Sequence, residues 1–277
     1  MCAIMVKLSS NRFLRGAYRH LKRLQPVIRE FQMSVLQGDQ PTHHGGGMTT
    51  RHQVPWLDDW QDFEAAVASI RQGEFDPETY GVDPGETFDR NMWRYWNVAY
   101  SIRHAVEHCQ SVSFNAVECG VAEGGTAFIA AAQLAAEPVA NYTFHLYDAW
   151  EGMRGDGLLP SEISLVGRYS SLSEARARDN LERFSANLCW HPGHIPESLD
   201  DTAPTTVSWI HIDLNSATAT LDVLEYLWPR MPEGAVLLLD DHGWLFWDDT
   251  RRVINRYLRS RPGTLLPLST GQAMYFR

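Results

Sequence analysis

The chain has 277 residues, of which 44% are hydrophobic, enough for one large globular domain with extensions or for two small ones. Its formal net charge of −10 argues against nucleic acid as the main partner, because phosphate backbones attract basic proteins. The sequence holds no apolar run near the roughly 20 residues of a membrane span. The apolar run at residues 2–6 is shorter than the ~7–15-residue core of a signal peptide, so we expect a cytoplasmic protein.

The first 50 residues differ from the rest in charge. Residues 1–29 carry seven basic residues and no acidic one, which leaves −17 on the remainder. Apolar residues on heptad positions predict a basic amphipathic helix over 12–36 that Pro26 kinks, and composition predicts a flexible linker over 38–50. Two interpretations of the helix stay open: it docks on its own domain, or it contacts a membrane surface or a second copy in a homo-oligomer.

Residues 51–110 are expected to form a helical cap. Aromatic and apolar side chains recur at helical spacing across 88–108, and we interpret this stripe as core packing, with a contribution to an acceptor pocket as the alternative. Residues 104–108 read His-Ala-Val-Glu-His, which matches an inverted zinc-protease signature. We do not predict a protease, because this helix precedes the first strand and no further zinc ligand is indicated.

From residue 114 onward, apolar runs bounded by turn residues alternate with amphipathic stretches. The predicted strands cover 114–118, 142–147, 187–190, 207–214 and 235–239, followed by a closing pair within 265–277. The predicted helices cover 126–136, 176–184, 219–228 and 249–259. This alternation predicts an α/β fold with a doubly wound, parallel sheet over residues 111–277.

Two of these strands end in carboxylates. Asp213 follows the apolar run 209–212, and Asp240 and Asp241 follow the run 235–239. Ligands of open α/β sheets bind just outside the carboxyl ends of the strands, so we expect the three aspartates to lie together there. Carboxylate oxygens are the ligands of hard cations such as Mg²⁺, which often bridges to substrate oxygens. The sequence therefore predicts a magnesium site at this edge of the sheet.

The first strand runs into a glycine-rich turn, residues 118–126. Glycines at the start of a helix let the backbone approach a ligand closely. The turn is not the G-x-G-x-x-G fingerprint, because Ala122 stands at the second glycine position, and it is not a P-loop, because no lysine follows the last glycine. Nicotinamide dinucleotides and nucleoside triphosphates are therefore disfavoured. Asp148, which ends the second strand, suits a ribose diol.

The sequence holds further histidines and cysteines, which are metal-ligand residue types, but we do not predict that they bind a metal. His211 lies two residues before Asp213 and shares its side of the strand, and we interpret it as a buried, hydrogen-bonded histidine. The His-Pro-Gly-His string at 191–194 is interpreted as a loop rather than a metal site. The four cysteines form no Cys-x-x-Cys pair and are expected to be reduced thiols.

Several blocks, in the same order along the chain, resemble those of the macrocin O-methyltransferase family (TylF/MycF type). The blocks are residues 118–126, 147–153, 192–199, 212–213 and 234–243. The resemblance implies a class I, Rossmann-like methyltransferase that depends on S-adenosylmethionine and Mg²⁺ and methylates a sugar hydroxyl of a natural product. The cofactor-binding residues that it implies are Glu118, Gly120, Glu123, Gly124, Thr126, Asp148 and Gly193. The implied metal ligands are Asp213, Asp240 and Asp241.

The chain departs from the family pattern at the general base. Family members use a histidine between the second and third strands, whereas residues 149–190 hold none, and Ala149 and Trp150 replace a Ser-Phe pair. The candidate catalytic residues are Asp213 and His242. We take His242 as the general base, because it directly follows the predicted metal ligands Asp240 and Asp241 and because histidine titrates near neutral pH. The expected partner is a small-molecule acceptor. Two alternatives stay open: Mg²⁺-dependent methylation of a catechol-like phenol, and a non-catalytic, methyltransferase-like binding protein.

Overall fold

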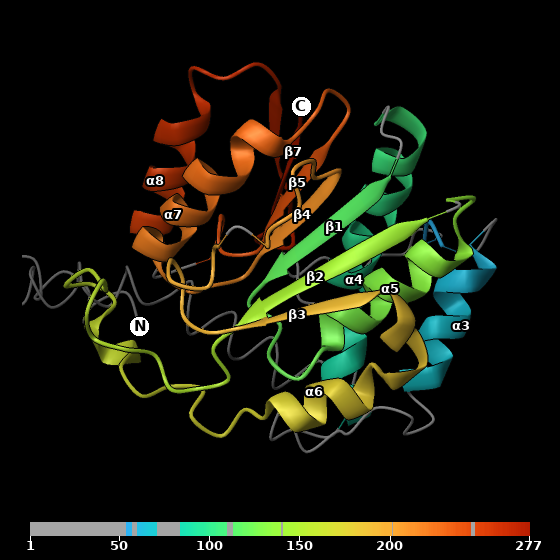
Figure 1. Cartoon of the computed structure of the whole chain (residues 1–277), viewed down its shortest axis with the longest axis horizontal. Coiled ribbons are helices and arrows are strands. Elements are labelled where there is room, and N and C mark those ends of the chain that lie inside the picture. Colours follow the sequence, from blue (N-terminus) through green and yellow to red (C-terminus); the bar gives the residue numbers. More distant parts are fainter. Residues whose placement is uncertain are drawn as a thin grey trace, which may run out of the picture. The chain divides into compact units, whose positions relative to one another are not determined.

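A seven-stranded mixed sheet runs through the part of the chain that the computed structural model describes (Figure 1). The described residues are 54–56, 60–70, 84–109, 113–139, 141–200, 202–244 and 247–277. They all belong to one compact unit, Thr42–Arg277. The predicted basic helix over 12–36 and the predicted linker over 38–50 lie outside the described residues.

The sheet is doubly wound, as the sequence predicts. Its strands, in the order in which they lie side by side, are β3 (Leu188–Pro192), β2 (Tyr142–Asp148), β1 (Phe114–Cys119), β4 (Trp209–Ile212), β5 (Val236–Leu239), β7 (Ala273–Phe276) and β6 (Thr264–Pro267). The first five are parallel, whereas β7 runs antiparallel to both β5 and β6. The chain winds outward from β1 in one direction and from β4 in the other, so the two halves of the sheet meet between β1 and β4.

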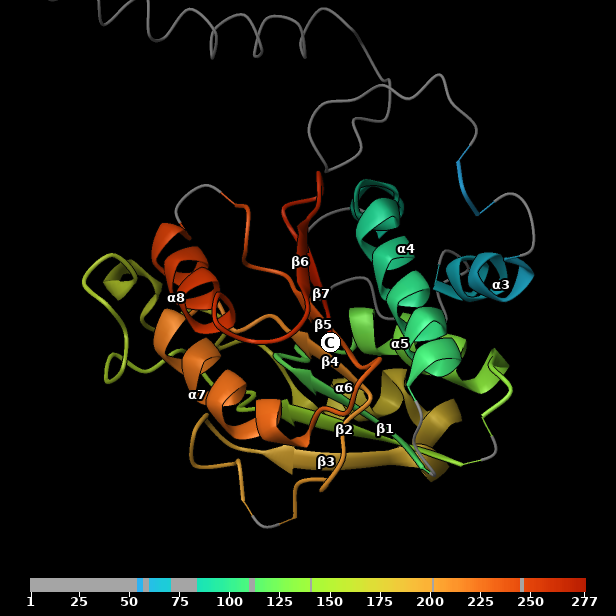
Figure 2. The ribbon, with the colours of Figure 1, turned by 90° about the horizontal axis from the view of Figure 1, so that it is seen from above.

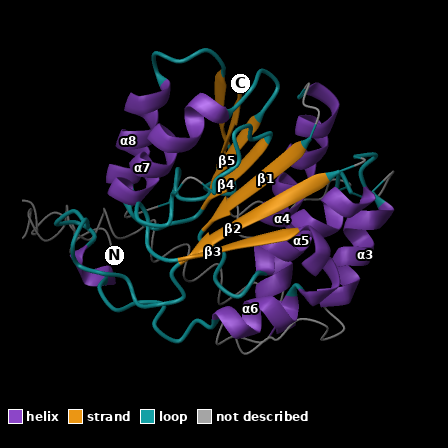
Figure 3. Cartoon of the chain, viewed as in Figure 1, coloured by secondary structure: helices purple, strands orange, loops and turns teal. Residues whose placement is uncertain are grey.

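Helices cover both faces of this sheet. The α-helices are α3 (Gln61–Ser69), α4 (Pro84–His108), α5 (Gly125–Ala136), α6 (Glu174–Asn180), α7 (Ala217–Leu227) and α8 (Asp248–Leu258). The described residues also contain the short 3-10 helices η4 (Ile163–Leu165), η5 (Glu182–Asn187) and η6 (Trp228–Arg230). Figure 2 shows α3, α4 and α5 on one side of the strands and α7 and α8 on the other, and Figure 3 shows the strands between these helical layers.

The alternation of side chains along each strand divides the hydrophobic core between the two faces. Trp209 of β4 packs on the α4 side, where its indole N–H donates a 2.8 Å hydrogen bond to Oγ of Ser101. The next residue, Ile210, belongs to the second cluster, together with Val223 and Leu227 of α7. Apolar packing therefore covers both faces, and polar side chains gather where the strands end.

The predicted elements match the observed ones except at a few boundaries. The helix predicted over 176–184 ends at Asn180, and the chain continues as η5. The strand predicted over 207–214 is shorter, with four residues in β4. The closing strands are antiparallel, because a tight turn joins them. Among the described residues, no helix combines the length and the apolar character that a bilayer span requires.

Candidate active site

A cavity of about 670 Å³ opens at the carboxyl ends of the parallel strands, where the two halves of the sheet meet. The turn after β1, Asp148 at the end of β2 and residues 193–197 after β3 line one part of it. Asp213 after β4, and Asp240 and Asp241 after β5, line another part. Ligands of open α/β sheets bind at this switch point, and the volume suits a small-molecule site.

Gly120 brings the ends of β1 and β4 close together. Its φ of +92° lies in the left-handed region, and a Cβ at this position would lie 1.9 Å from the carbonyl oxygen of Asp213. A side chain therefore does not fit between the two strand ends. Gly124, also at φ +92°, is the N-cap of α5. Of the glycine and threonine residues predicted to bind a cofactor, Gly120, Thr126 and Gly193 line the cavity, whereas Gly124 does not.

Asp148 joins the glycine-rich turn to the turn after β2. One carboxylate oxygen accepts a 2.8 Å hydrogen bond from the N–H of Ala122, and the other accepts a 2.8 Å hydrogen bond from the N–H of Trp150. Burial raises the pKa of Asp148, although these backbone donors act in the opposite direction. The side chain also lines the cavity, and a carboxylate can accept from the hydroxyls of a diol, so Asp148 fits a ligand diol.

Trp150 stands where the pattern of the macrocin O-methyltransferase family has phenylalanine, and its hydrogen bonds explain the difference. It adopts a φ of +47°, and its indole N–H donates a 2.6 Å hydrogen bond to the carbonyl oxygen of Ala122. The turn after β2 is therefore linked twice to the glycine-rich turn, once through Asp148 and once through the indole. A phenylalanine at this position would lack the second link.

Two predicted cofactor residues point elsewhere. Glu118 is fully buried on β1, with its Oε1 2.9 Å from Nδ1 of His211. Glu123 is also buried, and its carboxylate forms a 2.6 Å ion pair with Nη2 of Arg176 at the start of α6. Neither side chain lines the cavity. Each carboxylate is bound to a partner inside the protein, so the structure does not bring either of them to the cavity.

The three predicted metal ligands do come together. One oxygen from each of Asp213, Asp240 and Asp241 lies within 4.8 Å of the others. Asn215 orients two of them: its N–H donates to Oδ2 of Asp241 at 2.7 Å, and its side-chain amide donates to Oδ1 of Asp213 at 3.2 Å. Burial and the charge of Asp240 raise the pKa of Asp213 to about 7, and burial and the charge of Asp213 raise the pKa of Asp241. The raised pKa values reflect carboxylates that repel one another.

Arg94 of α4 is a partner of this carboxylate trio that the sequence analysis missed. Its guanidinium forms an ion pair with Oδ2 of Asp240 and lies 3.8 Å from Oδ2 of Asp213. Burial acts to raise the pKa of Asp240, but the charge of Arg94 prevails and holds that pKa well below its ordinary value. Asp240 also accepts a 3.0 Å hydrogen bond from Nε2 of Gln272. Asp240 is therefore ionised and fixed in orientation.

His211 is buried and paired, as the sequence analysis expects. In addition to its contact with Glu118, its Nε2 lies 3.8 Å from Oδ1 of Asp240. Burial acts to lower the pKa of His211, but its contacts with Asp240 and Glu118 raise it to about 10. The imidazolium is thus enclosed between two carboxylates on the α4 side of the sheet.

The charges at this strand edge fit a divalent cation. When all four carboxylates, Glu118, Asp213, Asp240 and Asp241, are ionised, they face two cationic side chains, Arg94 and His211, and a divalent cation would balance the two remaining negative charges. Buried charges are normally paired or coordinate a metal. Oxygen ligands in this number suit Mg²⁺, which keeps several positions for water or substrate oxygens. Asp213, Asp240 and Asp241 are the residues that would hold the ion.

His242, the candidate base, faces α8 instead of the cavity. It is buried, and its Nε2 lies 2.9 Å from Oδ1 of Asn255. Burial lowers its pKa, and it is not among the residues that line the cavity. Tyr169, which the sequence analysis missed, does line the cavity. Its pKa is raised by burial and by the charges of Asp213 and Asp241, so its phenol stays protonated near neutral pH.

Comparisons with known proteins agree with this architecture. Residues 117–242 match the family model described as a methyltransferase domain. The O-methyltransferase NovP shares 18% identity, with 67% of this chain and 80% of NovP covered at a TM-score of 0.60. The calicheamicin methyltransferase CalS11 shares 16% identity, with 84% and 98% covered at a TM-score of 0.59. A comparison with curated protein sequences found no match.

A second structure of CalS11, described as a TDP-rhamnose 3'-O-methyltransferase, gives a TM-score of 0.52 at 16% identity, with 81% of this chain and 96% of CalS11 covered. At these identities the structural likeness establishes the fold. Together with the family match, it shows that the chain carries a methyltransferase domain over residues 117–242 on a Rossmann-like class I methyltransferase fold.

Proposed function

We propose that the protein is an S-adenosylmethionine- and Mg²⁺-dependent O-methyltransferase that acts on a hydroxyl of a sugar or of a glycosylated natural product. The observation that carries the proposal is a single cavity lined both by the glycine-rich turn with Asp148 and by the carboxylate trio. The resemblance to macrocin O-methyltransferases supports it. So does the likeness to CalS11, which is described as a methyltransferase of a nucleotide sugar.

Each part of the cavity has its own task in this proposal. The turn at Gly120 and Thr126, with the N-terminus of α5 and Asp148, would bind S-adenosylmethionine, which supplies a methyl group on a sulfonium. Asp213, Asp240 and Asp241 would hold Mg²⁺, which lowers the pKa of hydroxyl groups bound to it. The chain orients the reactants, and positioning can supply much of the reduction in the barrier.

The walls near the carboxylate trio indicate where the acceptor binds. Tyr169, Trp244 and Trp247 line the same cavity as Asp213 and Asp241. Aromatic side chains beside a few polar groups are typical of small-molecule sites. The same walls suit a catechol-like phenol, whose adjacent oxygens match a bound cation, so this acceptor class is the second candidate. Protonated Tyr169 can donate a hydrogen bond to an acceptor oxygen.

Turnover with methyl-labelled S-adenosylmethionine tests the proposal, with a panel of nucleotide sugars, glycosides and catechols as acceptors. We expect a sugar or glycoside to be methylated, and chelator to abolish the reaction. Asp241→Asn should lower kcat by at least about 100-fold, the scale expected when a preorganised electrostatic contact at the reacting group is lost. Calorimetry should give the same affinity for S-adenosylhomocysteine in Asp241→Asn as in the unmodified protein.

Asp179→Asn is the matched control, because Asp179 lies exposed on α6, away from the cavity. It should change neither turnover nor cofactor affinity. Full turnover in chelator would rule out the metal part of the proposal. Methylation of catechols alone would replace the sugar by the phenol, and cofactor binding without transfer to any acceptor would favour a non-catalytic binding protein.

A further inference from the structure

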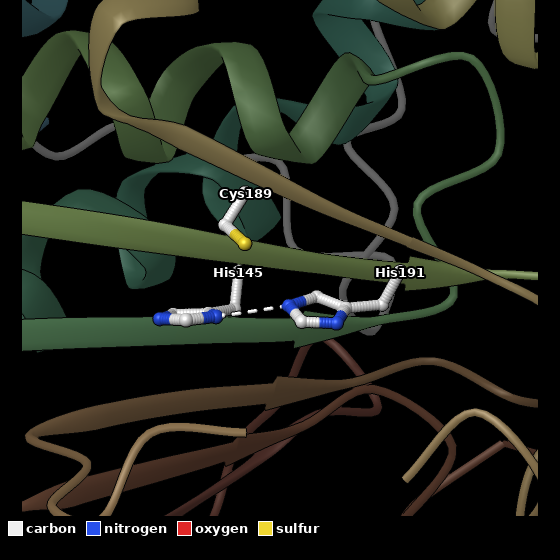
Figure 4. A group of neighbouring side chains, drawn as sticks. All are labelled: His145, Cys189 and His191. Atoms are coloured by element: carbon white, nitrogen blue, oxygen red, sulfur yellow. Dashed lines mark hydrogen bonds between the residues drawn. The ribbon is translucent and has the colours of Figure 1, made fainter. Parts of the chain in front are cut away.

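A second group of metal-ligand side chains lies on the opposite half of the sheet from the carboxylate trio. In the parallel pairing of β2 with β3, Cys189 lies opposite His145, and His191 lies opposite Tyr147. Side chains two residues apart on a strand share a face, so His145, Cys189 and His191 project to the same side. One ligand atom from each lies within 4.8 Å of the others. Figure 4 shows the three side chains gathered together, with ring nitrogens of the two histidines facing each other.

The hydrogen bonds around His191 determine which of its nitrogens is free to bind a metal. Its Nδ1 lies 3.3 Å from Oγ1 of Thr202, and that hydroxyl donates its own proton to Oδ1 of Asp200 at 2.5 Å. Oγ1 of Thr202 is therefore the acceptor, and Nδ1 of His191 carries the proton. Nε2 of His191 then presents a lone pair toward Nδ1 of His145, 2.9 Å away. A hydroxyl and a carboxylate behind a histidine are the usual support for a metal ligand.

We propose that His145, Cys189 and His191 form a binding site for a zinc-like divalent cation, distinct from the carboxylate trio. Nδ1 of His145, Nε2 of His191 and the thiolate of Cys189 would be the ligands, and water would fill the fourth position. Two imidazoles and one thiolate are a donor set that zinc accepts in a tetrahedral site. On binding, the proton on Nδ1 of His145 moves to Nε2 of the same ring, so both imidazoles stay neutral, and the thiol proton leaves for solvent.

The distances suit such an ion with little rearrangement. Two nitrogens at zinc-bond length in a tetrahedral site lie about 3.3 Å apart. Nδ1 of His145 and Nε2 of His191 lie 2.9 Å apart, so the rings need to separate by a few tenths of an ångström and to turn until both lone pairs point at the ion. His145 and His191 are buried, and Cys189 is half-buried on a strand at the edge of the sheet, which gives an ion a route from solvent.

The two candidate sites select different ions. The carboxylate trio offers oxygen atoms, which suit Mg²⁺, whereas the second site offers nitrogen and sulfur, which suit Zn²⁺ and Co²⁺. The second site also adjoins the cavity wall. The ring of His191 stacks on that of Tyr147 at 4.1 Å, and Tyr147 lines the cavity. A bound ion would therefore clamp β2 to β3 close to Asp148, without contacting the reactants.

Cobalt titration of the full chain, after chelator treatment to remove metal, tests the proposal. Thiolate coordination gives Co²⁺ a charge-transfer absorption in the near ultraviolet, which oxygen ligands do not give. We expect one equivalent of Co²⁺ to produce this band, and Zn²⁺ to displace it. Cys189→Ser should remove the band, and His145→Gln should weaken Zn²⁺ binding at least tenfold in competition with a chromophoric chelator. Absence of the band in the unmodified protein would overturn the proposal, whatever the variants do.

Matched controls separate this site from the other thiols and from the carboxylate trio. Cys2→Ser and Cys109→Ser should keep the band, and Asp241→Asn should keep it as well. A band that survives Cys189→Ser, or that disappears with Cys109→Ser, would contradict the assignment. Thr202→Val is a milder variant that keeps all three ligands. It should keep the band but weaken Zn²⁺ binding by about tenfold, because Thr202 no longer fixes the tautomer of His191.

Discussion

Arg94 is the residue on which the balance of charge at the carboxylate trio depends. Its ion pair with Asp240 is largely buried, with 22% of the Arg94 side chain and 5% of the Asp240 side chain exposed, and breaking such a pair by removing one partner costs up to about 3–5 kcal/mol, because the remaining charge is left uncompensated. We predict that Arg94→Met lowers the free energy of unfolding by this amount in chelator, measured by urea denaturation. Mg²⁺ should restore part of the loss. Calorimetry should give a higher affinity for Mg²⁺, because the guanidinium of Arg94 no longer competes with the ion.

The control for this experiment is Arg252→Met. Arg252 pairs with Asp249 at 2.7 Å on the surface of α8, and exposed pairs contribute at most about 1 kcal/mol. Its removal should leave both the stability and the Mg²⁺ response nearly unchanged. An Arg94→Met protein that no longer binds Mg²⁺ would show that Arg94 supports the cation site instead of competing with it.

Single residues also show where sequence-based prediction of the site stops. Asp213, Asp240 and Asp241 are predictable, because each directly follows a buried apolar run and parallel strands bring their ends together. The role of Arg94 is not predictable from the sequence, because its partner Asp240 lies 146 residues away along the chain. Nothing local distinguishes this arginine from the others on the same helix. The contact of Glu118 with His211 is not predictable for a related reason, since His211 comes from the neighbouring strand.

At the scale of elements, His242 links the turn after β5 to α8 through Asn255. We predict that His242→Ala lowers the free energy of unfolding by about 1–3 kcal/mol, the cost of an unsatisfied buried partner. His242→Gln, whose amide can still bind Asn255, should lose less. Because the side chain faces α8, both variants should keep kcat within tenfold of the unmodified protein. Loss of kcat together with loss of its pH dependence would instead restore His242 as the base.

The pH dependence of stability gives an independent measurement on the same link. Burial lowers the pKa of His242, so the folded protein keeps the ring neutral where the unfolded chain takes up a proton. The unfolded state therefore binds more protons below the ordinary histidine pKa of about 6.5, and stability falls as the pH drops through that value. Urea denaturation between about pH 7 and pH 5 should show that the free energy of unfolding declines less steeply in His242→Gln than in the unmodified protein.

The elements themselves are the most predictable part of the fold. The order of strands and helices from residue 114 onward is predictable, because the buried strands are continuous apolar runs and the helices are amphipathic stretches between them. Boundaries are less predictable where tertiary contacts decide them, as at Asn180, whose side chain donates to the carbonyl oxygen of Glu123 as α6 ends. Register between strands is not a local property. The pairing of Cys189 on β3 with His145 on β2 therefore could not be predicted from the sequence.

At the scale of the whole molecule, the cavity lies where the two halves of the sheet diverge, and its two binding regions come from different halves. The glycine-rich turn and Asp148 follow β1 and β2, whereas the carboxylate trio follows β4 and β5. Gly120 is the point of contact between them, because its backbone packs against Asp213. We therefore expect the proposed cofactor and the proposed metal ion to bind with independent energies, although their ligands converge on one space.

This separation makes a prediction for ligand-induced stability. A ligand that binds only the folded state at 100 times its Kd stabilises it by about 2.7 kcal/mol, which corresponds to a rise in Tm of about 5–10 °C for a domain of this size. S-adenosylhomocysteine should produce such a rise in a thermal melt, equally with Mg²⁺ and with chelator. Asp148→Asn should reduce the rise, since the amide offers one acceptor oxygen where the carboxylate offers two, whereas Asp179→Asn should not. A rise that requires Mg²⁺ would mean that the metal organises the cofactor site, and the two halves of the sheet would then act as one binding unit.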